Sequence, residues 1–150
     1  HSFLHDALPS FNAAYDLTML RAEATRWGLR QPDWPRPLVV DPYVIDLCIE
    51  RGGLGPRRLT DVADYYAVPL DNAHDAAADA WAARNVAVEI GARHPWVGMS
   101  NLSELMHSQR GWYADRAEDW NSYARTAGRS LDDPSGWPLS SGLPQQAATA

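Results

Sequence analysis

The sequence predicts an α/β protein, and three observations lead to this class. A short apolar run, Leu-Val-Val at residues 38–40, is rich in β-branched side chains and is typical of a buried strand. Apolar residues at helical spacing occur on both sides of this run. The chain has 150 residues, 45% of them hydrophobic and 21% charged, which is ordinary for one globular domain. Because only one convincing strand is visible, we expect an incomplete parallel or mixed sheet flanked by helices.

Two segments precede this strand. Residues 1–9 have weak periodicity and make a poor strand. The next segment carries apolar residues at helical spacing (Leu17, Leu20, Ala24 and Trp27), and Gly28 follows as a C-cap, so we predict a helix over residues 15–27. Residues 30–37 contain three prolines and are predicted to form a loop.

Three helices are predicted after the strand, which ends at Asp41-Pro42. A short helix covers residues 43–51 and leads into a glycine-rich turn. The next helix covers residues 57–68, with Thr60 as N-cap and Asp61 in the first turn. A long helix then runs from residue 73 to residue 93 and is stopped by Pro95.

A second long helix is predicted over residues 101–128. Its apolar residues recur at spacings of three, four and seven, which predicts a core-facing stripe: Leu102, Leu105, Met106, Tyr113, Ala117, Trp120 and Ala124. From Asp132 the chain is small, polar and broken by prolines, as in disordered segments. We therefore expect a partial domain over residues 1–95, a helical C-terminal extension over 96–131 and a disordered tail over 132–150.

Composition excludes several classes of protein. The sequence has no apolar run long enough to span a membrane and no secretory signal, and its single cysteine, Cys48, allows no internal disulfide. We therefore expect a cytoplasmic protein. The net charge of −6 is unlike that of a protein that coats nucleic acid, but it is compatible with an enzyme whose metal ions face the phosphate. Because the first residue is His1 and not methionine, we expect the chain to be a fragment.

Two helix starts carry polar residues that could be functional. The first is "NAAYD", with Asn12 and Asp16, and the second is "HDAAAD", with His74 and Asp79. For each pattern alone, capping or a favourable interaction with the helix dipole explains the aspartates. A metal site is the alternative interpretation.

Taken together, these patterns resemble a known family. "NAAYDLTML", followed some 60 residues later by "LTDVADYYAVPLDNAHDAAADAWAA", is similar to the second and third motifs of the DEDDh 3'-5' exonucleases. This is the family of the proofreading epsilon subunit of bacterial DNA polymerase III, which has an RNase H-like fold. The resemblance covers residues 10–93 and includes the N-A-x-x-D motif, the apolar strand, the V-P-L turn and the H-x4-D motif. It implies a partial RNase H-like exonuclease fold.

The resemblance also implies a role for each motif residue. Asp16 and Asp79 would coordinate two Mg²⁺ or Mn²⁺ ions, which prefer hard oxygen ligands. His74 would be the general base, and Asn12 would help to bind the substrate and orient the loop around Asp16. The expected partner is the 3' end of a nucleic acid, single-stranded DNA in the first instance, and the expected product is a nucleoside monophosphate.

The sequence departs from the family at the first motif. The family carries a D-x-E pair on its first strand, and no Asp in this chain is followed two residues later by Glu. Asp16 and Asp79 supply two negative charges against the four positive charges of two divalent ions. We therefore expect this chain alone to be weakly active or inactive. The alternative function is a non-catalytic, exonuclease-like module that binds a polymerase or another protein through its C-terminal helix.

The "RGGLGPRR" segment offers a second kind of candidate. Its bland interpretation is a flexible surface loop, and its functional interpretation is contact between Arg57 and Arg58 and the nucleic acid backbone. Several other aspartates are best explained as caps, turns or solvated faces: Asp41, Asp46, Asp61, Asp64 and Asp71. Asp75 stays open because it is adjacent to His74.

Overall fold

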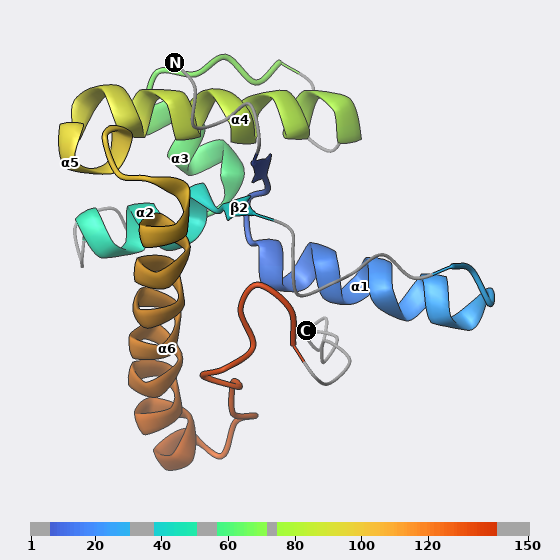
Figure 1. The fold of residues 1–150 in the computed structure, drawn as a ribbon. Coiled ribbons are helices and arrows are strands. Elements are labelled where there is room, and N and C mark those ends of the chain that lie inside the picture. Colours follow the sequence, from blue (N-terminus) through green and yellow to red (C-terminus); the bar gives the residue numbers. More distant parts are fainter. Residues whose placement is uncertain (1–6, 31–37, 51–56, 72–74, 141–150) are drawn as a thin grey trace. The chain divides into compact units, whose positions relative to one another are not determined.

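The computed structural model describes residues 7–30, 38–50, 57–71 and 75–140. Within these ranges it contains six helices and two short strands (Figure 1). The protein is therefore mostly helical, and the predicted α/β class is confirmed only by one small parallel sheet. The chain divides into two compact units. Unit 1 comprises His1–Asn12 and Leu38–Trp112, and unit 2 comprises Ala13–Pro37 and Tyr113–Ala150.

The sheet of unit 1 consists of β1 (Leu8–Pro9) and β2 (Val39–Val40), which pair in parallel. The Leu8 N–H donates to the Leu38 carbonyl at 2.7 Å, and the Ser10 N–H donates to the Val40 carbonyl at 3.1 Å. Pro9 lies between these two donors, so its missing N–H falls on the side of β1 that faces away from β2. The segment that the sequence marked as a poor strand is thus a strand, although only two residues long.

Three helices of unit 1 begin at identifiable caps. The Asp41 side chain accepts from the Tyr43 N–H and caps α2 (Pro42–Ile49), in which Pro42 occupies the first turn. In α3 (Leu59–Tyr65) the N-cap residue is Arg58, so the prediction of Thr60 as N-cap was wrong. Asp75 caps α4 (Ala76–Arg93).

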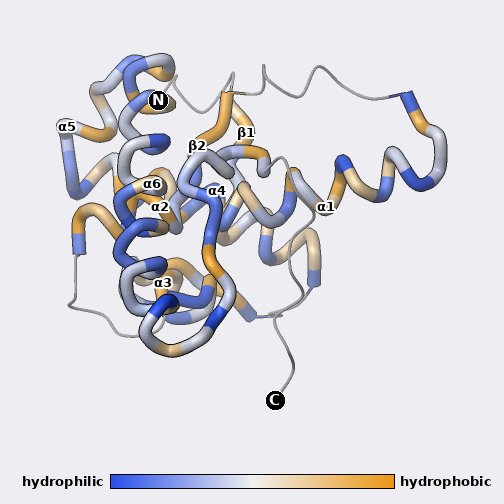
Figure 2. The backbone as a smooth tube through the Cα atoms, turned by 90° about the horizontal axis from the view of Figure 1, so that it is seen from below, coloured by the Kyte–Doolittle hydropathy of each residue, from blue (hydrophilic) through white to orange (hydrophobic). Residues whose placement is uncertain are grey.

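Unit 1 is held together by one apolar core. The core side chains come from β2, α2, α3, α4 and the first turns of α6 (Leu102–Ala127), and the mixture of apolar and polar residues along these helices is visible in Figure 2. Its fully buried members include Val40, Ile45, Tyr66, Val86, Ile90 and Leu105. Burying side chains of this size stabilises the fold by about 1.5–3 kcal/mol each.

A short helix, α5 (Pro95–Gly98), follows α4 and was not predicted. It packs on the last turn of α4 through glycines. A Cβ atom on Gly98 would lie 2.5 Å from the Gly91 carbonyl oxygen, which is closer than any side chain allows. The absence of a side chain at residue 98 therefore lets the two helices approach each other at this point.

In unit 2, α1 (Ala13–Arg26) starts two residues before the predicted position. It ends as predicted, because Gly28 has a φ of +61° and Leu29 N–H donates to the Ala24 carbonyl. The predicted apolar stripe was largely wrong: Leu17 is buried, whereas Leu20 and Trp27 are 58% and 68% exposed. The small residues Ala13, Ala14 and Thr18 form much of the buried face of α1 instead.

The second part of α6 also belongs to unit 2, and its predicted stripe is confirmed at Ala117 and Ala124, which are buried. The Asn121 side chain donates to the Asp132 carbonyl at 2.9 Å and accepts from the Asp132 N–H at 2.7 Å. Trp137 is buried. Residues 132–140 therefore have defined contacts, which the expected disordered tail over 132–150 did not foresee, and residues 141–150 lie outside the described part. None of the described helices has the length and apolar character needed to cross a membrane.

Candidate functional site

The turn between β1 and α1 carries the first predicted site residue, Asn12. Its φ is +65°, a left-handed conformation that asparagine tolerates better than most residues. The Asn12 backbone N–H donates to Asp41 Oδ1 at 2.9 Å, while its side chain is exposed. The structure thus shows Asn12 in a turn that is held through its backbone, and the role in substrate binding that the resemblance implies for it stays a prediction.

Asp41 connects the ends of the two strands. It directly follows β2, it is fully buried, and its Oδ1 accepts from both Asn12 N–H and Tyr43 N–H. The sequence placed Asp41 among aspartates that form caps, turns or solvated faces; the structure makes it a buried N-cap that also contacts the turn after β1, a contact that was not predicted. The carboxyl ends of parallel strands lie at one edge of a sheet, which is where open α/β folds commonly bind ligands. The Asn12 turn and the Asp41 cap lie at that edge.

Asp16 lies in the first turn of α1 and is exposed. A carboxylate at this position interacts favourably with the helix dipole, by about 0.3–1 kcal/mol. This position also leaves the carboxylate accessible to a cation. Asp16 belongs to unit 2, whereas Asn12 and Asp79 belong to unit 1.

The start of α4 shows which aspartate of the "HDAAAD" motif caps the helix. Asp75 accepts from Ala77 N–H at 3.1 Å and from Ala78 N–H at 3.0 Å, so Asp75 is the N-cap. Asp79 lies one turn further along, is half-buried and is not needed as a cap. His74 lies outside the described residues. Capping therefore explains Asp75, and the functional interpretation of Asp79 stays a prediction.

The two predicted arginines have different surroundings. The Arg57 side chain is 10% exposed, and its Nε donates at 2.9 Å to Asp46 Oδ2, which is fully buried. Its Nη2 also donates to the Glu50 carbonyl. These contacts favour a structural role for Arg57. Arg58 is exposed; its backbone N–H donates to Asp61 Oδ2 at 3.1 Å, and its carbonyl accepts from the Val62 N–H at 3.1 Å.

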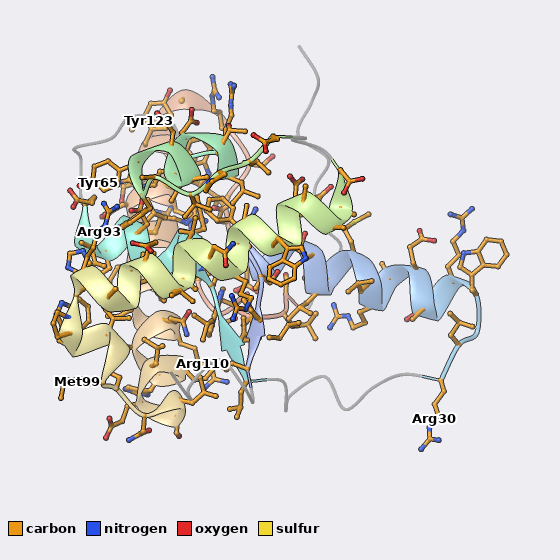
Figure 3. The ribbon with its side chains drawn as sticks, turned by 90° about the horizontal axis from the view of Figure 1, so that it is seen from above. Arg30, Tyr65, Arg93, Met99, Arg110 and Tyr123 are labelled. Carbon is orange, nitrogen blue, oxygen red and sulfur yellow. The ribbon has the colours of Figure 1, made fainter. Side chains whose placement is uncertain are left out.

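A buried polar cluster surrounds Asp46, which sequence analysis had placed among caps, turns and solvated faces. Its Oδ1 accepts from the Tyr66 hydroxyl at 3.0 Å, and burial together with the Asp46 charge raises the pKa of Tyr66. Beside it, Tyr65 donates to Glu50 at 3.0 Å, and this bond raises the pKa of Tyr65. Arg93 lies over the rings of both tyrosines, and Figure 3 labels Arg93 and Tyr65. The cluster joins α2, α3 and α4, and the apolar run around Asp46 was the signal for its burial.

The donor chemistry of the predicted metal ligands suits Mg²⁺ or Mn²⁺, since Asp16 and Asp79 both offer carboxylate oxygens. Among the described residues, no group of three or more His, Cys, Asp or Glu side chains is arranged to hold a metal ion. That set of residues does not include His74. The two carboxylates are therefore ligands of a suitable type, and the binding of a metal ion to them stays a prediction.

Comparison of the chain with models of protein families, with curated proteins and with solved structures finds no match.

Proposed function

We propose that this chain carries the second and third motifs of a DEDDh 3'-5' exonuclease and serves in the removal of nucleotides from the 3' end of DNA. The observation that supports this proposal most is the hydrogen bond between Asn12 and Asp41, which connects the ends of β1 and β2. Two residues separate β1 from the N-A-A-Y-D motif, β1 runs parallel to β2, and the Asn12 N–H donates to Asp41 Oδ1 at the edge where both strands end. Open α/β folds commonly bind ligands at the carboxyl ends of parallel strands, and the motif follows such an end here.

Two divalent cations held by Asp16 and Asp79 would offset the charge of the scissile phosphodiester and favour ionisation of a bound water. The chain itself is acidic, with a net charge of −6. Its own residues therefore repel a polyanion in the absence of such cations. For this reason we expect nucleic acid binding and hydrolysis to depend on Mg²⁺ or Mn²⁺.

His74 acts as the general base in this proposal. Its imidazole accepts a proton from the attacking water while the water oxygen forms a bond to phosphorus. The bond from phosphorus to the 3' oxygen of the preceding nucleotide breaks, and that oxygen takes a proton from solvent. The products are a nucleoside 5'-monophosphate and a strand shortened by one residue. A histidine is suited to this step because its pKa lies near neutral pH.

Degradation of a 5'-labelled single-stranded oligonucleotide with Mn²⁺ tests the proposal. We compare this chain with the full product of its gene, each with and without His74→Ala. For a gene product that carries a D-x-E pair, we expect a ladder of single-nucleotide steps from the 3' end and a loss of about 100-fold or more with His74→Ala. This chain alone is expected to be weakly active or inactive, because it contains no D-x-E pair.

The missing D-x-E pair favours a second candidate, a non-catalytic module that binds a polymerase or another protein partner. Absence of any ladder from both forms of the protein would support this second candidate and contradict the nuclease proposal. A ladder that His74→Ala leaves intact would point to a contaminating nuclease or to a different site.

A further inference from the structure

The second edge of β2 is covered by side chains of α6 instead of a neighbouring strand. The Val39 N–H donates to Met106 Sδ at 3.1 Å, and the Val39 carbonyl accepts from Gln109 Nε2 at 3.0 Å. The Asp41 N–H donates to Gln109 Oε1 at 2.7 Å. Three backbone groups that would pair with another strand are thus satisfied by two side chains, and all the residues involved lie in unit 1.

Gln109 occupies this position because a carboxamide presents a donor and an acceptor side by side, as a peptide group does. Its side chain is fully buried, and Nε2 also donates to the Leu105 carbonyl at 3.2 Å. The orientation of the amide is fixed, since a carbonyl faces Nε2 and an N–H faces Oε1. A buried polar group of this kind holds its partners in one arrangement, because any other leaves polar atoms unsatisfied.

The contacts continue from Gln109 to the predicted site. Gln109 holds the backbone of Asp41, and the Asp41 carboxylate holds the backbone of Asn12. Asn12 adopts its left-handed conformation at this bond, directly before the first residue of α1. We name this series of contacts the Gln109–Asp41–Asn12 relay.

We propose that Gln109 and Asp41 are positioning residues of the nuclease site, because the relay holds the Asn12 turn in one arrangement. This inference rests on the proposed function. It adds that α6 is part of the scaffold of the site, although the sequence marks it as an extension. Residues that orient a metal-binding carboxylate or its loop commonly change activity by about 10- to 100-fold when they are replaced.

The test combines amide hydrogen exchange in this chain with the kinetics of the full gene product. Gln109→Met keeps an unbranched side chain of similar length and removes both hydrogen bonds to β2 and the Asp41 backbone. Leu105→Ala is the matched control, because Leu105 is equally buried on the same helix face but contributes no side-chain bond to the relay. Asp41→Ala and Asp41→Asn form a second pair, since asparagine can still accept from the Asn12 N–H and cap α2.

We expect Gln109→Met and Asp41→Ala to lose exchange protection at the Asn12 amide and to lower kcat by about 10- to 100-fold, with a change in KM of no more than about twofold. Asp41→Asn is expected to retain both the exchange protection of the Asn12 amide and the kcat of the unaltered protein. Leu105→Ala is expected to lower thermal stability and leave Asn12 protection in place.

Retained protection at Asn12 in Gln109→Met and Asp41→Ala would overturn the relay itself. Lost protection with unchanged kcat would overturn its role in the site, as would an equal loss of kcat in Leu105→Ala. If the unaltered protein does not degrade DNA at all, the proposed function fails, and the exchange data still decide whether the relay exists.

Discussion

Neighbouring residues of the same type can have different roles, and Arg57 and Arg58 are an example. Both were predicted to contact nucleic acid. Arg57 is almost completely buried in an ion pair with Asp46, whereas Arg58 is exposed. A buried charge without its partner is costly, because the interior solvates it poorly.

At the same scale, we predict that Arg57→Met lowers the free energy of unfolding by about 3–5 kcal/mol, because it leaves the Asp46 carboxylate buried and unpaired. Arg58→Met is the matched control, with an expected change within about 0.5 kcal/mol and a weakened affinity for single-stranded DNA. Urea denaturation at neutral pH measures the first effect. Similar stability losses in both variants would contradict the structural role of Arg57.

A second prediction at the residue scale concerns Tyr66. Burial and the neighbouring Asp46 raise the pKa of Tyr66 above its ordinary value of 10.0. In the unfolded chain the phenol loses its proton near that ordinary value, while the folded protein retains the proton to higher pH. The contribution of Tyr66 to stability is therefore fully present below the pKa that its phenol has in the unfolded chain. This contribution is lost as pH rises toward the higher pKa in the folded protein.

We accordingly expect the free energy of unfolding to fall as pH rises above about 10, and to fall less steeply in Tyr66→Phe. Tyr123→Phe, on the exposed face of α6, is the control and should follow the unaltered protein. Urea denaturation across this pH range measures the slopes. Equal slopes for all three proteins would show that Tyr66 does not contribute in the way described.

At the scale of the elements, the contact between α4 and α5 depends on a missing side chain. Gly98→Ala would place a Cβ atom 2.5 Å from the Gly91 carbonyl oxygen, so we expect it to be destabilising. The cost of such overpacking is about 1–3 kcal/mol. Gly111→Ala in α6 is the matched control, because no atom lies within 4 Å of the added group.

For the control we expect a gain of up to about 1 kcal/mol, since alanine is a better helix former than glycine. Thermal unfolding of both variants beside the unaltered protein provides the comparison. A Gly98→Ala protein as stable as the unaltered one would show that α5 moves freely away from α4.

The elements also show which features a sequence can reveal. The long stripe of α6 and the C-cap of α1 at Gly28 were predictable, because many turns or a specific cap residue carry the signal. β1 has two residues, too few for any periodicity, and α5 has four. The apolar face of α1 was mispredicted because Ala13 and Ala14 are buried while larger side chains are exposed.

The candidate site residues come from local sequence motifs, whereas the contacts that support them in the structure do not. Asn12, Asp16, His74 and Asp79 emerge from motif order and spacing, which are local in sequence. The contacts of Gln109 with Val39 and Asp41 join residues about 70 positions apart, and no local pattern marks them. A glutamine inside an apolar stripe was the only available signal, since a buried carboxamide requires partners.

For the molecule as a whole, charge decides whether the proposed function is possible. The chain carries a net charge of −6, yet its proposed substrate is a polyanion. The carboxylates at the two motifs must therefore act through cations and not as caps alone. Asp75 and Asp79 allow this requirement to be tested on one helix, because only Asp75 is the N-cap of α4.

The most direct measurement is the rate of Mn²⁺-dependent nucleotide release by the full gene product carrying either Asp79→Asn or Asp75→Asn. Both changes remove one negative charge near the start of α4, and asparagine still caps the helix at residue 75. We predict that Asp79→Asn abolishes nucleotide release and that Asp75→Asn preserves it. Full activity in Asp79→Asn, or equal losses in both variants, would contradict a metal-binding role for Asp79 and with it the proposed nuclease.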